Sequence, residues 1–600
     1  MNNIAKRLKM LPVVCAAAMT LGLTGCEDFL NRPDDSSYTL SDFYKSDEQC
    51  LQAANILYSV PWYDFFRGWI QVGETMSGNH YMGSNGFWRL TLKDGTVDGQ
   101  LADMSASLWA VNARANTIIE NINRYGGGTS TEVGRNTAKG EALVWKALAY
   151  FFMVRIYGAV PIVHNNTELM ATGEYSSLYR IKINYVYDYI IMTLKKALEW
   201  LPETPEKGRV GKYAAYGLLA KVYLTKSGYG MSGSRNQDDL DQAAKYAKLV
   251  ADHYEYWLEP EYADIFRGSG NFTREALISW RWVVASDSYW TAYNSLQSDL
   301  AIAGFDEYGS GGAWGNWVGP SLDLQAAFGE DATKKTRNNY DKRRKSTMMM
   351  YGDVYDGNGC PSFWRDHPTK AKSDGSGTVT FSNGFDWTMY CRDVLNSFDS
   401  STGANAVKHL VGNNEDHLAE IGTPNGQMKT GLATHILRLA DVYLILAEAT
   451  LGNAESTTDA TALRAFNAVR DRAGVDEKTS ITFDDIFKER RLELAYEGDY
   501  WYDFVRLSYY KPAEAVAMIN AQNRKNYIGL NDYYKSTNDA PYAGGDGLMI
   551  PRINKEEPPT GDNYCTPESF TVPFPETDLQ MNPHLNEEPQ DADISQYTYH

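Results

Sequence analysis

Large aromatic side chains accumulate in glycine-rich segments of this sequence, and several carboxylate and guanidinium groups lie near them. The chain contains 15 tryptophans and 41 tyrosines. A pyranose ring stacks its apolar C–H face on an aromatic ring, whereas its hydroxyl rim needs carboxylate, amide or guanidinium partners. We therefore predict a carbohydrate-binding surface made from Trp88, Glu74, Trp290, Trp314, Trp317, Tyr390 and Arg392. The alternative for each aromatic residue is a place in the core, because large aromatic side chains are mostly buried.

Motifs for catalysis or cofactor binding are weak in this sequence. Residues 228–233 (GYGMSG) satisfy GxGxxG but follow a predicted helix, whereas a dinucleotide site requires strand, turn and helix in that order. No GxSxG, P-loop or HExxH motif occurs, and the nine histidines lack metal-ligand spacing. Asp353, Asp356 and Asn358 fit a calcium site or an ordinary Asp-Gly-Asn-Gly turn equally well. We predict no catalytic residue, metal or cofactor, while a carboxylate pair for glycoside hydrolysis stays open as an alternative.

The first 25 residues have the layout of a secretory signal peptide. Three cations within residues 6–9 precede an apolar run over residues 10–23, which is too short to span a membrane. The sequence Leu-Thr-Gly-Cys at 23–26 then matches a bacterial lipobox, in which the cysteine is acylated after cleavage of the signal. We predict Cys26 as the lipidation site, because several acyl chains, such as palmitate, anchor a protein without a transmembrane helix.

Composition and cysteine usage exclude several classes of protein. A net charge of −19 argues against nucleic acid as a partner and against a polybasic membrane surface. Apart from Cys26 and the signal peptide, the cysteines are Cys50, Cys360, Cys391 and Cys565, without CxxC spacing. A zinc site is therefore not predicted, and a bridge between Cys360 and Cys391 is only conceivable.

Helical periodicity recurs in pairs of segments over the first half of the chain. We predict helices at 41–60, 100–123, 142–156, 185–201, 212–226 and 240–252. Small alanines at the expected contacts favour tetratricopeptide-like helix pairs. Residues 61–95 are rich in Gly, Trp and Tyr without a sustained helical period, so they are predicted as exposed loop or irregular packing.

Three further helices are predicted between Thr434 and Leu507. The first covers 436–451, the second follows the Asp459 capping region and stops at Gly474, and the third starts at Thr482 and runs to 507. In the third helix Arg491 and Gly498 fall on the apolar face. Because a buried guanidinium needs a carboxylate, we expect an acidic partner for Arg491 and a close backbone at Gly498. A structural ion-pair network explains these charges better than catalysis does.

Between residues 259 and 429 the helical period disappears and Gly, Asp, Asn, Trp and Tyr accumulate. The segments ALISWRWVVA and GTVTFSN read as short strands, and GGAWGNW gives Trp314 and Trp317 glycine neighbours that would let a ligand approach. We predict a loop-rich insert that lies with the 61–95 loops on one side of the helices.

Several motifs together resemble a known family. RLADVYLILAEA, FNAVRDRAG and ERRLELAYEGDYWYDFVRL resemble, in order and spacing, the C-terminal signature of SusD/RagB-like outer-membrane lipoproteins, and GEALVWKALAYFFMVRIYGAVPIV matches its N-terminal half. The chain departs from the pattern at Tyr500, where the family usually has an arginine. The resemblance implies a mainly α, SusD-like single domain of tetratricopeptide-like helix pairs. Its predicted parts are a signal peptide at 1–25, a helical platform at about 41–258 and 430–510, an insert at about 259–429, and a C-terminal segment at 511–600.

The same resemblance implies a non-enzymatic function. It predicts an oligo- or polysaccharide-binding lipoprotein of the cell outer membrane, facing the exterior, that delivers glycan to a SusC-type TonB-dependent transporter. Glu27 and Asp28 look like the acidic export tag of such surface lipoproteins, and Trp88 lies where members often place a stacking tryptophan. Two alternatives stay open, namely a lipid-anchored glycoside hydrolase and a RagB-like protein that takes up peptides.

Overall fold

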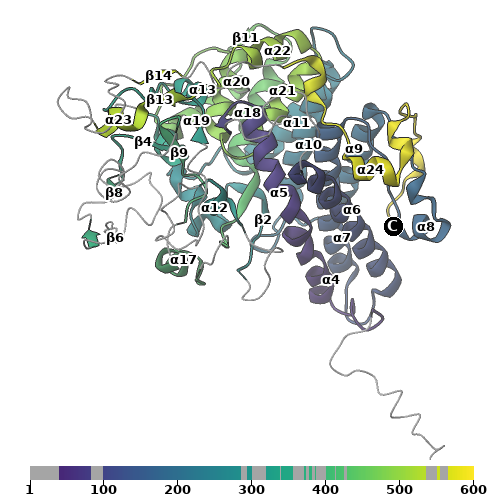
Figure 1. Cartoon of the computed structure of the whole chain (residues 1–600). Coiled ribbons are helices and arrows are strands. Elements are labelled where there is room, and N and C mark those ends of the chain that lie inside the picture. Colours follow the sequence, from purple (N-terminus) through teal and green to yellow (C-terminus); the bar gives the residue numbers. More distant parts are fainter. Residues whose placement is uncertain are drawn as a thin grey trace, which may run out of the picture.

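The computed structural model describes most of the chain and leaves out several segments (Figure 1). The described residues are 40–82, 99–284, 294–300, 319–337, 340–355, 370–372, 378–380, 385–386, 401–411, 414–424, 429–535, 551–553 and 565–600. Among them, no helix is long and apolar enough to cross a membrane.

Helices of the first half form one packed layer. They are α4 (Asp47–Ala54), α6 (Gly99–Tyr125), α7 (Glu132–Tyr157), α8 (Asn166–Thr172), α9 (Ile183–Trp200), α10 (Lys212–Lys226) and α11 (Gln237–His253). Helix α7 starts where the Thr131 hydroxyl accepts a hydrogen bond from the Gly134 amide, and it stops at Gly158, whose φ is 73°. It is buried on almost all sides because α4, α6 and α9 all pack against it (Figure 1).

A second group of helices packs onto this layer. It consists of α18 (Leu439–Leu451), α19 (Ala460–Ala473), α20 (Phe483–Leu494), α21 (Tyr500–Ser508) and α22 (Pro512–Asn520). Helix α18 contacts both α10 and α11, so chain segments some 200 residues apart share one interior. As predicted, Asp459 caps α19 and Gly474 ends it in the left-handed region, with a φ of 74°.

Two of the helices predicted in this group are wrong in part. Residues Thr434–Arg438 form strand β10, which pairs antiparallel with β2 (Ala276–Trp280), and α18 begins only at Leu439. The helix predicted from 482 to 507 is broken between α20 and α21. At this break Tyr496 and Gly498 have φ values of 64° and 71°, which an α-helix cannot accommodate. We call residues 495–499 the α20–α21 break.

The prediction for residues 41–82 also needs correction, while residues 83–95 lie outside the described residues. The first helix, α4, is short and is followed by 3-10 turns at Asn55–Tyr58 and Val60–Trp62. Helix α5 (Tyr63–Ile70) and the π-helical turn Gln71–Met76 then occupy sequence that was predicted as exposed loop or irregular packing. Most of these residues are buried, and within α5 only Asp64 is exposed, so the short helix keeps one narrow polar side and packs its aromatic side chains against the core.

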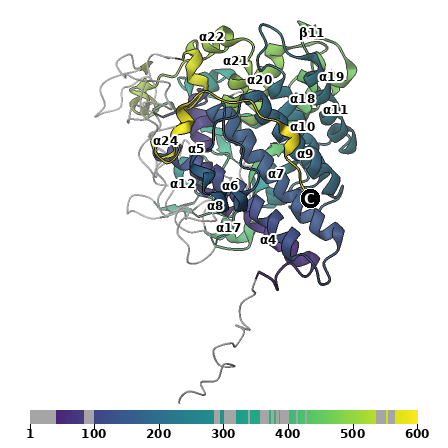
Figure 2. The same cartoon turned by 90° about the vertical axis from the view of Figure 1, so that its right-hand side faces the viewer.

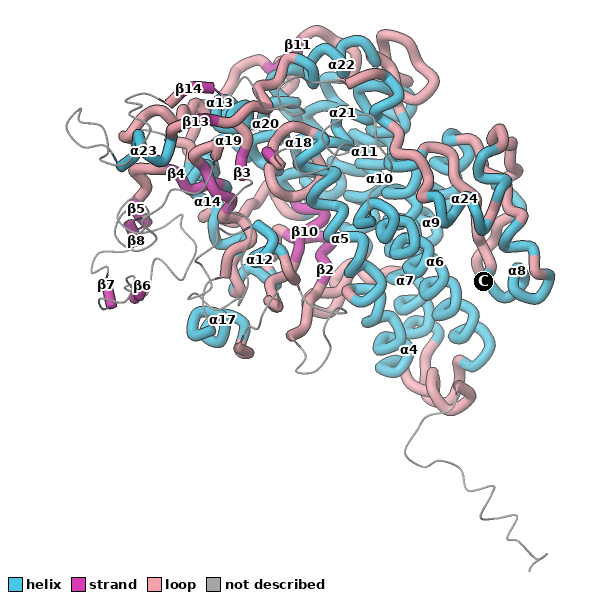
Figure 3. Tube along the Cα trace, in the orientation of Figure 1, coloured by secondary structure: helices cyan, strands magenta, loops and turns pink. Residues whose placement is uncertain are grey.

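Strands in the described part of the chain pair only two by two, and Figure 3 shows most of them gathered on the side away from α4 to α9. Besides β2 and β10, the pairs are β1 (His80–Tyr81) with β3 (Gly319–Pro320), β4 (Met348–Met350) with β9 (Ala404–Ala406), β5 (Val354–Tyr355) with β8 (Phe385–Asp386), β6 (Lys370–Lys372) with β7 (Thr378–Thr380), β11 (Ser456–Thr457) with β12 (Ile481–Thr482), and β13 (Tyr527–Ile528) with β14 (Arg552–Ile553). Short helices α12 (Leu296–Leu300), α13 (Leu322–Ala327), α14 (Lys342–Thr347), α17 (Asn414–Ile421) and α23 (Leu530–Lys535) lie among them. Strands β2 and β7 confirm the two short strands predicted in the insert.

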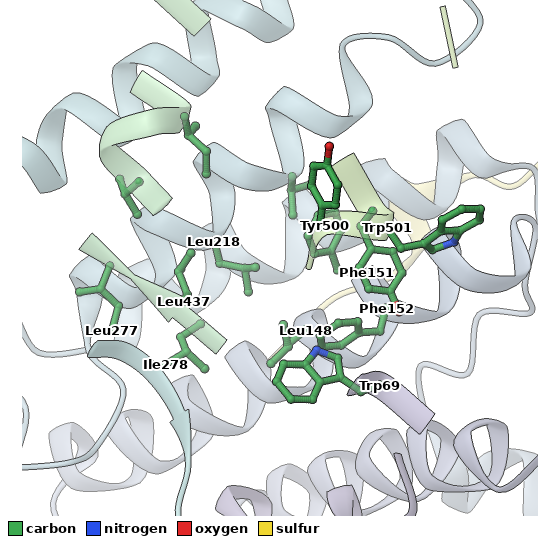
Figure 4. Packing of buried hydrophobic residues seen from close by; sticks show 14 of the residues in the cluster. Trp69, Leu148, Phe151, Phe152, Leu218, Leu277, Ile278, Leu437, Tyr500 and Trp501 are labelled. Carbon is green, nitrogen blue, oxygen red and sulfur yellow. The ribbon is translucent and has the colours of Figure 1, made fainter. Parts of the chain in front are cut away.

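The hydrophobic interior joins both helical groups and β2–β10. Trp69, Leu148 and Phe152 point toward one another beside Leu218 and Leu437 (Figure 4). Gly73 lies against the α20–α21 break, where an added Cβ would stand 2.3 Å from the backbone of Gly498. This contact confirms the expected close approach of another backbone at Gly498.

The C-terminal segment runs back along the first layer of helices (Figure 2). It includes α24 (Glu576–Met581), and its Tyr599 hydroxyl lies 3.1 Å from that of Tyr189 in α9. The amide of Val572 donates to the carbonyl of Ile156 at the end of α7. The last residues therefore complete the surface of the first helical layer.

Candidate functional site

The described part of the chain contains one of the predicted carbohydrate-binding residues, Glu74. Trp88, Trp290, Trp314, Trp317, Tyr390 and Arg392 lie outside the described residues, as do the predicted lipidation site Cys26 and the cysteines Cys360 and Cys391. Their roles stay predictions. The structure describes the residues that precede and follow these segments, and it shows the hydrogen bonds and strand pairs that those residues form.

Glu74 lies inside the protein with both carboxylate oxygens engaged. Its side chain accepts hydrogen bonds from Nδ2 of Asn79 (2.9 Å) and from the backbone amide of Gly498 (2.7 Å). Only 1% of the residue is exposed, and burial raises the pKa of its carboxyl group. The structure thus gives Glu74 a structural contact between the end of the π-helical turn and the α20–α21 break. Its role as a ligand for sugar hydroxyls stays a prediction.

Three short stretches that are far apart in sequence meet next to Glu74. Tyr81 of β1 is paired with Gly319 of β3. Gly319 packs so closely on residue Ala404 of β9 that an added Cβ would stand 2.4 Å from its carbonyl oxygen. We call β1, β3 and residues 402–404 the loop anchor.

The loop anchor stands at the base of three segments that carry predicted site residues. The segment with Trp88 follows β1, the segment with Trp314 and Trp317 ends at β3, and the segment with Tyr390 and Arg392 ends just before residue 402. The described chain therefore brings the bases of these segments together. The segment with Trp290 ends elsewhere, at Asn294, whose backbone exchanges two hydrogen bonds of 2.9 Å with Thr430.

Polar side chains hold the loop anchor from α13. The Ser321 hydroxyl donates to the carbonyl of Gly78 (2.6 Å) and also caps α13 by accepting from the Leu324 amide. Nε2 of Gln325 donates to the carbonyls of Pro320 (3.1 Å) and Thr402 (2.9 Å), and so ties two parts of the anchor together. These residues were not predicted from the sequence, although the order Ser-Leu-Asp-Leu at 321–324 is a helix-start signal that indicates α13.

Arg491 of α20 links Asn79, the residue before β1, to Asp323 of α13, the helix after β3. Its Nε donates to Oδ1 of Asn79 (2.8 Å) and its Nη1 pairs with Oδ2 of Asp323 at 2.7 Å. Asp323 is the acidic partner that was predicted for Arg491. The guanidinium also lies 5.1 Å from the ring centroid of Tyr500, the position at which the family pattern has an arginine.

The anchor contains a histidine that stays neutral. Nδ1 of His80 lies 2.7 Å from the Tyr496 hydroxyl in the α20–α21 break. Burial lowers the pKa of His80 to about 3, because a charged imidazole would lose its hydration inside the protein. His80, Tyr81 and Met82 are all buried, so the anchor itself offers no surface for a ligand.

On its other side the α20–α21 break contacts a cluster of buried charges. Arg438 pairs with Glu497 (Nε to Oε2, 2.6 Å), with Glu493 (Nη1 to Oε1, 3.1 Å) and with Glu275. Lys408 pairs with Glu497 at 2.7 Å, and Arg472 pairs with Glu275 and Glu493. We call these six residues the core charge cluster. Its three cations balance its three carboxylates, and each is at most 8% exposed, so the cluster has the structural role predicted for these charges.

The described residues show no group of three or more side chains that could hold a metal ion, and one small cavity lies in the core. Asp353, considered above for calcium, instead pairs with Arg344 (Oδ1 to Nη2, 2.6 Å) and accepts from the Met350 amide. A cavity beside Trp69, Phe152 and Asp499 has a volume of about 10 Å³, which suits one water molecule and no sugar ring.

Comparison with known proteins finds two family models, a relative and solved structures that are similar to this chain. The model described as "SusD family" matches residues 171–590, and the model described as "Starch-binding associating with outer membrane" matches residues 28–224. A SusD-like protein of Bacteroides ovatus is 30% identical, over 98% of both chains. One solved crystal structure has 30% identity and a TM-score of 0.75, covering 92% of this chain and 99% of its own. Another, solved with a xylogluco-oligosaccharide, has 28% identity and a TM-score of 0.71, covering 91% and 99%.

These likenesses extend over nearly the whole chain and agree with the fold described above. They confirm the resemblance found in the sequence and the mainly helical architecture with few short strands. Association with the outer membrane is implied by the family description. The chain belongs to the SusD family.

Proposed function

We propose that this protein is a lipid-anchored glycan-binding protein on the outer face of the outer membrane, which passes oligosaccharides to a SusC-type TonB-dependent transporter. The observation that carries the proposal is the relative solved with a xylogluco-oligosaccharide, which is similar over 91% of this chain. A xyloglucan-type oligosaccharide is therefore the first ligand to test.

The loop anchor supports this proposal by its geometry. Stacking aromatics bind a sugar well only when the segments that carry them are held in place beforehand, since ordering them on binding costs free energy. Hydrogen bonds from Ser321, Gln325 and Arg491 fix the bases of the segments with Trp88, Trp314, Trp317, Tyr390 and Arg392. We propose that these aromatics, with Arg392, form the main sugar-contact surface, and that Trp290 extends it.

Calorimetry on the protein lacking residues 1–26 tests the binding surface. We expect weak binding of a xylogluco-oligosaccharide. Trp88→Ala or Trp314→Ala should each lose about 1–3 kcal/mol of binding free energy at an unchanged melting temperature, the scale of a stacking contact. Trp200→Ala is the matched control, because Trp200 is a half-buried tryptophan at the end of α9, beside Lys139 and Lys196. Parental affinity in both test variants would place the site elsewhere.

The alternatives give different results in the same preparation. The SusD family consists of non-catalytic carbohydrate-binding proteins, so incubation with polysaccharide should release no reducing ends. A RagB-like function would appear as binding of peptides that compete with the oligosaccharide. Peptide binding without glycan binding would replace the proposed ligand class.

The anchor and the transporter are tested in cells. Cys26→Ser should leave the protein unacylated and absent from the outer membrane, because the acyl chains are the membrane-binding element proposed here. Unchanged detergent partitioning of this variant would contradict the anchor. Isolation of the wild-type protein from native membranes should bring with it a large TonB-dependent barrel protein, and its absence would count against the transporter.

A further inference from the structure

Arg281, directly after β2, is a mostly buried arginine without a counter-ion. Its Nε and Nη1 are buried and donate no hydrogen bond, and its backbone amide donates to the carbonyl of Tyr58 at 2.7 Å. Burial lowers the pKa of its guanidinium to about 10, and no carboxylate of the described chain offsets this effect. The charge also acts on its surroundings, since it adds to the burial that lowers the pKa of His435 to about 3.

The other buried arginines of the described residues have carboxylate or carbonyl partners. Arg438 and Arg472 pair with carboxylates of the core charge cluster, and Arg490 pairs with Asp441 at 2.7 Å. Arg524 has no carboxylate either, but Nη2 donates to the carbonyl of Met76 at 2.6 Å. An uncompensated guanidinium is expensive, and buried donors without acceptors are rare in native proteins. Arg281 therefore has neither a carboxylate nor a hydrogen-bond acceptor for its side chain among the described residues, whereas Arg472 and Arg491, which also have one guanidinium nitrogen without an acceptor, pair with carboxylates.

Two exposed groups lie beside Arg281. The guanidinium carbon is 4.7 Å from the ring centroid of Phe272, and Nζ of Lys207 is 5.1 Å from the same centroid. Phe272 is 50% exposed, so part of its ring faces solvent. Gly208, with a φ of 88°, lets the 207–208 turn pass close to this ring, because a Cβ there would stand 2.7 Å from it.

The charges around this patch leave it cationic. Lys207 is exposed and pairs with no carboxylate in the part of the chain that the structure describes. Glu206, the acidic neighbour in sequence, acts instead on Arg209 and Glu141, which pair with each other at 2.8 Å. Two cations and an exposed aromatic ring therefore converge without an ion pair to any carboxylate of the described residues, on a protein whose net charge is −19.

We propose that Lys207, Phe272 and Arg281 form a second sugar-binding site, selective for acidic sugars such as uronates. The carboxylate of the sugar would bind between Lys207 and the outer edge of the Arg281 guanidinium, and a C–H face would lie against the exposed part of Phe272. The choice of a sugar rather than another carboxylate rests on the proposed function. None of the three residues belongs to the loop anchor, so this site is separate from the surface proposed above.

A matched pair of ligands tests the selectivity. The protein lacking residues 1–26 is titrated with a cello-oligosaccharide and with the same oligosaccharide oxidised at C6 to a glucuronate oligomer, and with acetate alone. We expect the oxidised ligand to bind about tenfold more tightly than the neutral one, on the scale of a charge-assisted hydrogen bond. The difference should shrink as salt is raised, because screening weakens exposed charges. Equal affinity for both oligosaccharides would overturn the proposal, and binding of acetate as tight as that of the oligomer would reduce the site to a simple anion site and overturn its sugar selectivity.

Variants locate the site. Arg281→Met and Lys207→Met should each remove most of the tenfold preference, and Phe272→Ala should weaken the oligomer but not acetate. Lys245→Met is the control, since Lys245 also lies over an aromatic ring, that of Tyr246 at 5.3 Å, on α11. If Arg281→Met fails to fold, Lys207→Met still decides the question because its side chain is exposed. A preference that survives Lys207→Met would exclude this patch.

The results for the second site can be distinguished from the results for the main sugar-contact surface. Binding of neutral xylogluco-oligosaccharide without any acid preference would overturn the second site alone. An acid preference that depends on Lys207 but comes without neutral binding would overturn the main surface and keep the second site.

Discussion

The α20–α21 break contacts two regions that are built from different interactions. On one side of the break, the carbonyl of Ala495 accepts a hydrogen bond from Lys408, and Glu497 is itself a member of the core charge cluster. Three cations and three carboxylates are buried together there. On the other side, Tyr496 and Gly498 contact His80 and Glu74 next to the loop anchor. The anchor is held mainly by neutral hydrogen bonds and two-residue strands.

From this difference we expect the core charge cluster to contribute mainly to the stability of the protein and the loop anchor to contribute mainly to ligand binding. The cations and carboxylates of the cluster balance one another inside the protein, so the loss of one charge leaves an uncompensated buried charge. Each hydrogen bond in the anchor contributes a modest amount by itself, so the anchor tolerates changes that alter the segments above it. We therefore expect substitutions in the cluster to unfold the protein and substitutions in the anchor to change ligand affinity.

The largest effect is expected for Arg438→Met. This change removes the one cation that Glu275, Glu493 and Glu497 share, so the three carboxylates of the cluster keep only two of its cations, Arg472 and Lys408. It keeps a side chain of similar length and should destabilise the protein by about 3–5 kcal/mol in urea unfolding. Lys248→Met is the control, because its pair with Asp252 is exposed on α11 and should matter by less than about 0.5 kcal/mol. A loss below about 1 kcal/mol for Arg438→Met would show that the cluster is not the main source of stability.

Acid should affect the two regions in different pH windows. The surrounding cations lower the pKa of Glu497 to about 2 from 4.5, so its contribution is complete above 4.5 and is lost as pH falls to 2. His80 has a folded pKa of about 3 against 6.5, so the unfolded chain binds more protons and stability falls as pH drops from 6.5 to 3. The free energy of unfolding, measured between pH 7 and 3, should therefore decline first through buried histidines.

A histidine substitution separates these windows. His80→Gln can keep a hydrogen bond to Tyr496 and should flatten the decline between pH 6 and 4.5 by about 1–2 kcal/mol. His584→Gln, at a surface residue paired with Glu587, should leave the profile unchanged. If both variants follow the wild-type profile, His80 does not titrate as its buried position requires.

The smallest effect on stability is expected for Ser321→Ala. It removes the hydrogen bond to Gly78 and the cap of α13, which together amount to about 1 kcal/mol, yet it should weaken binding of the xylogluco-oligosaccharide severalfold. Ser508→Ala removes a similar hydroxyl, which donates to the Val505 carbonyl within α21, and should leave affinity unchanged. Parental affinity in Ser321→Ala would mean that the anchor does not set the position of the binding segments.

Local sequence determined most of the helices and the family of this protein. The cap at Asp459 and the stops at Gly158 and Gly474 are short-range signals, so α19 and the C-terminal end of α7 fall close to prediction, whereas α7 begins at Glu132 and not at the predicted residue 142. The apolar face that carries Arg491 and Gly498 likewise required an acidic partner and a close backbone, because burying a charge or a crowded backbone is costly in any fold. That pattern did not indicate which residues would meet these requirements. The structure shows that they are Asp323 for Arg491 and Gly73 for Gly498.

Only the tertiary structure decided the pairing of distant segments. Thr434–Arg438 has an apolar pattern that suits a helix or a strand, and it is a strand because β2, more than 150 residues earlier, offers a partner edge. The α20–α21 break exists because Trp69, Glu74 and Lys408 occupy the space and the hydrogen-bonding groups that a continuous helix would use. The loop anchor joins residues near 80, 320 and 403, and no local periodicity encodes such contacts, since they form only when the whole chain has folded around one core.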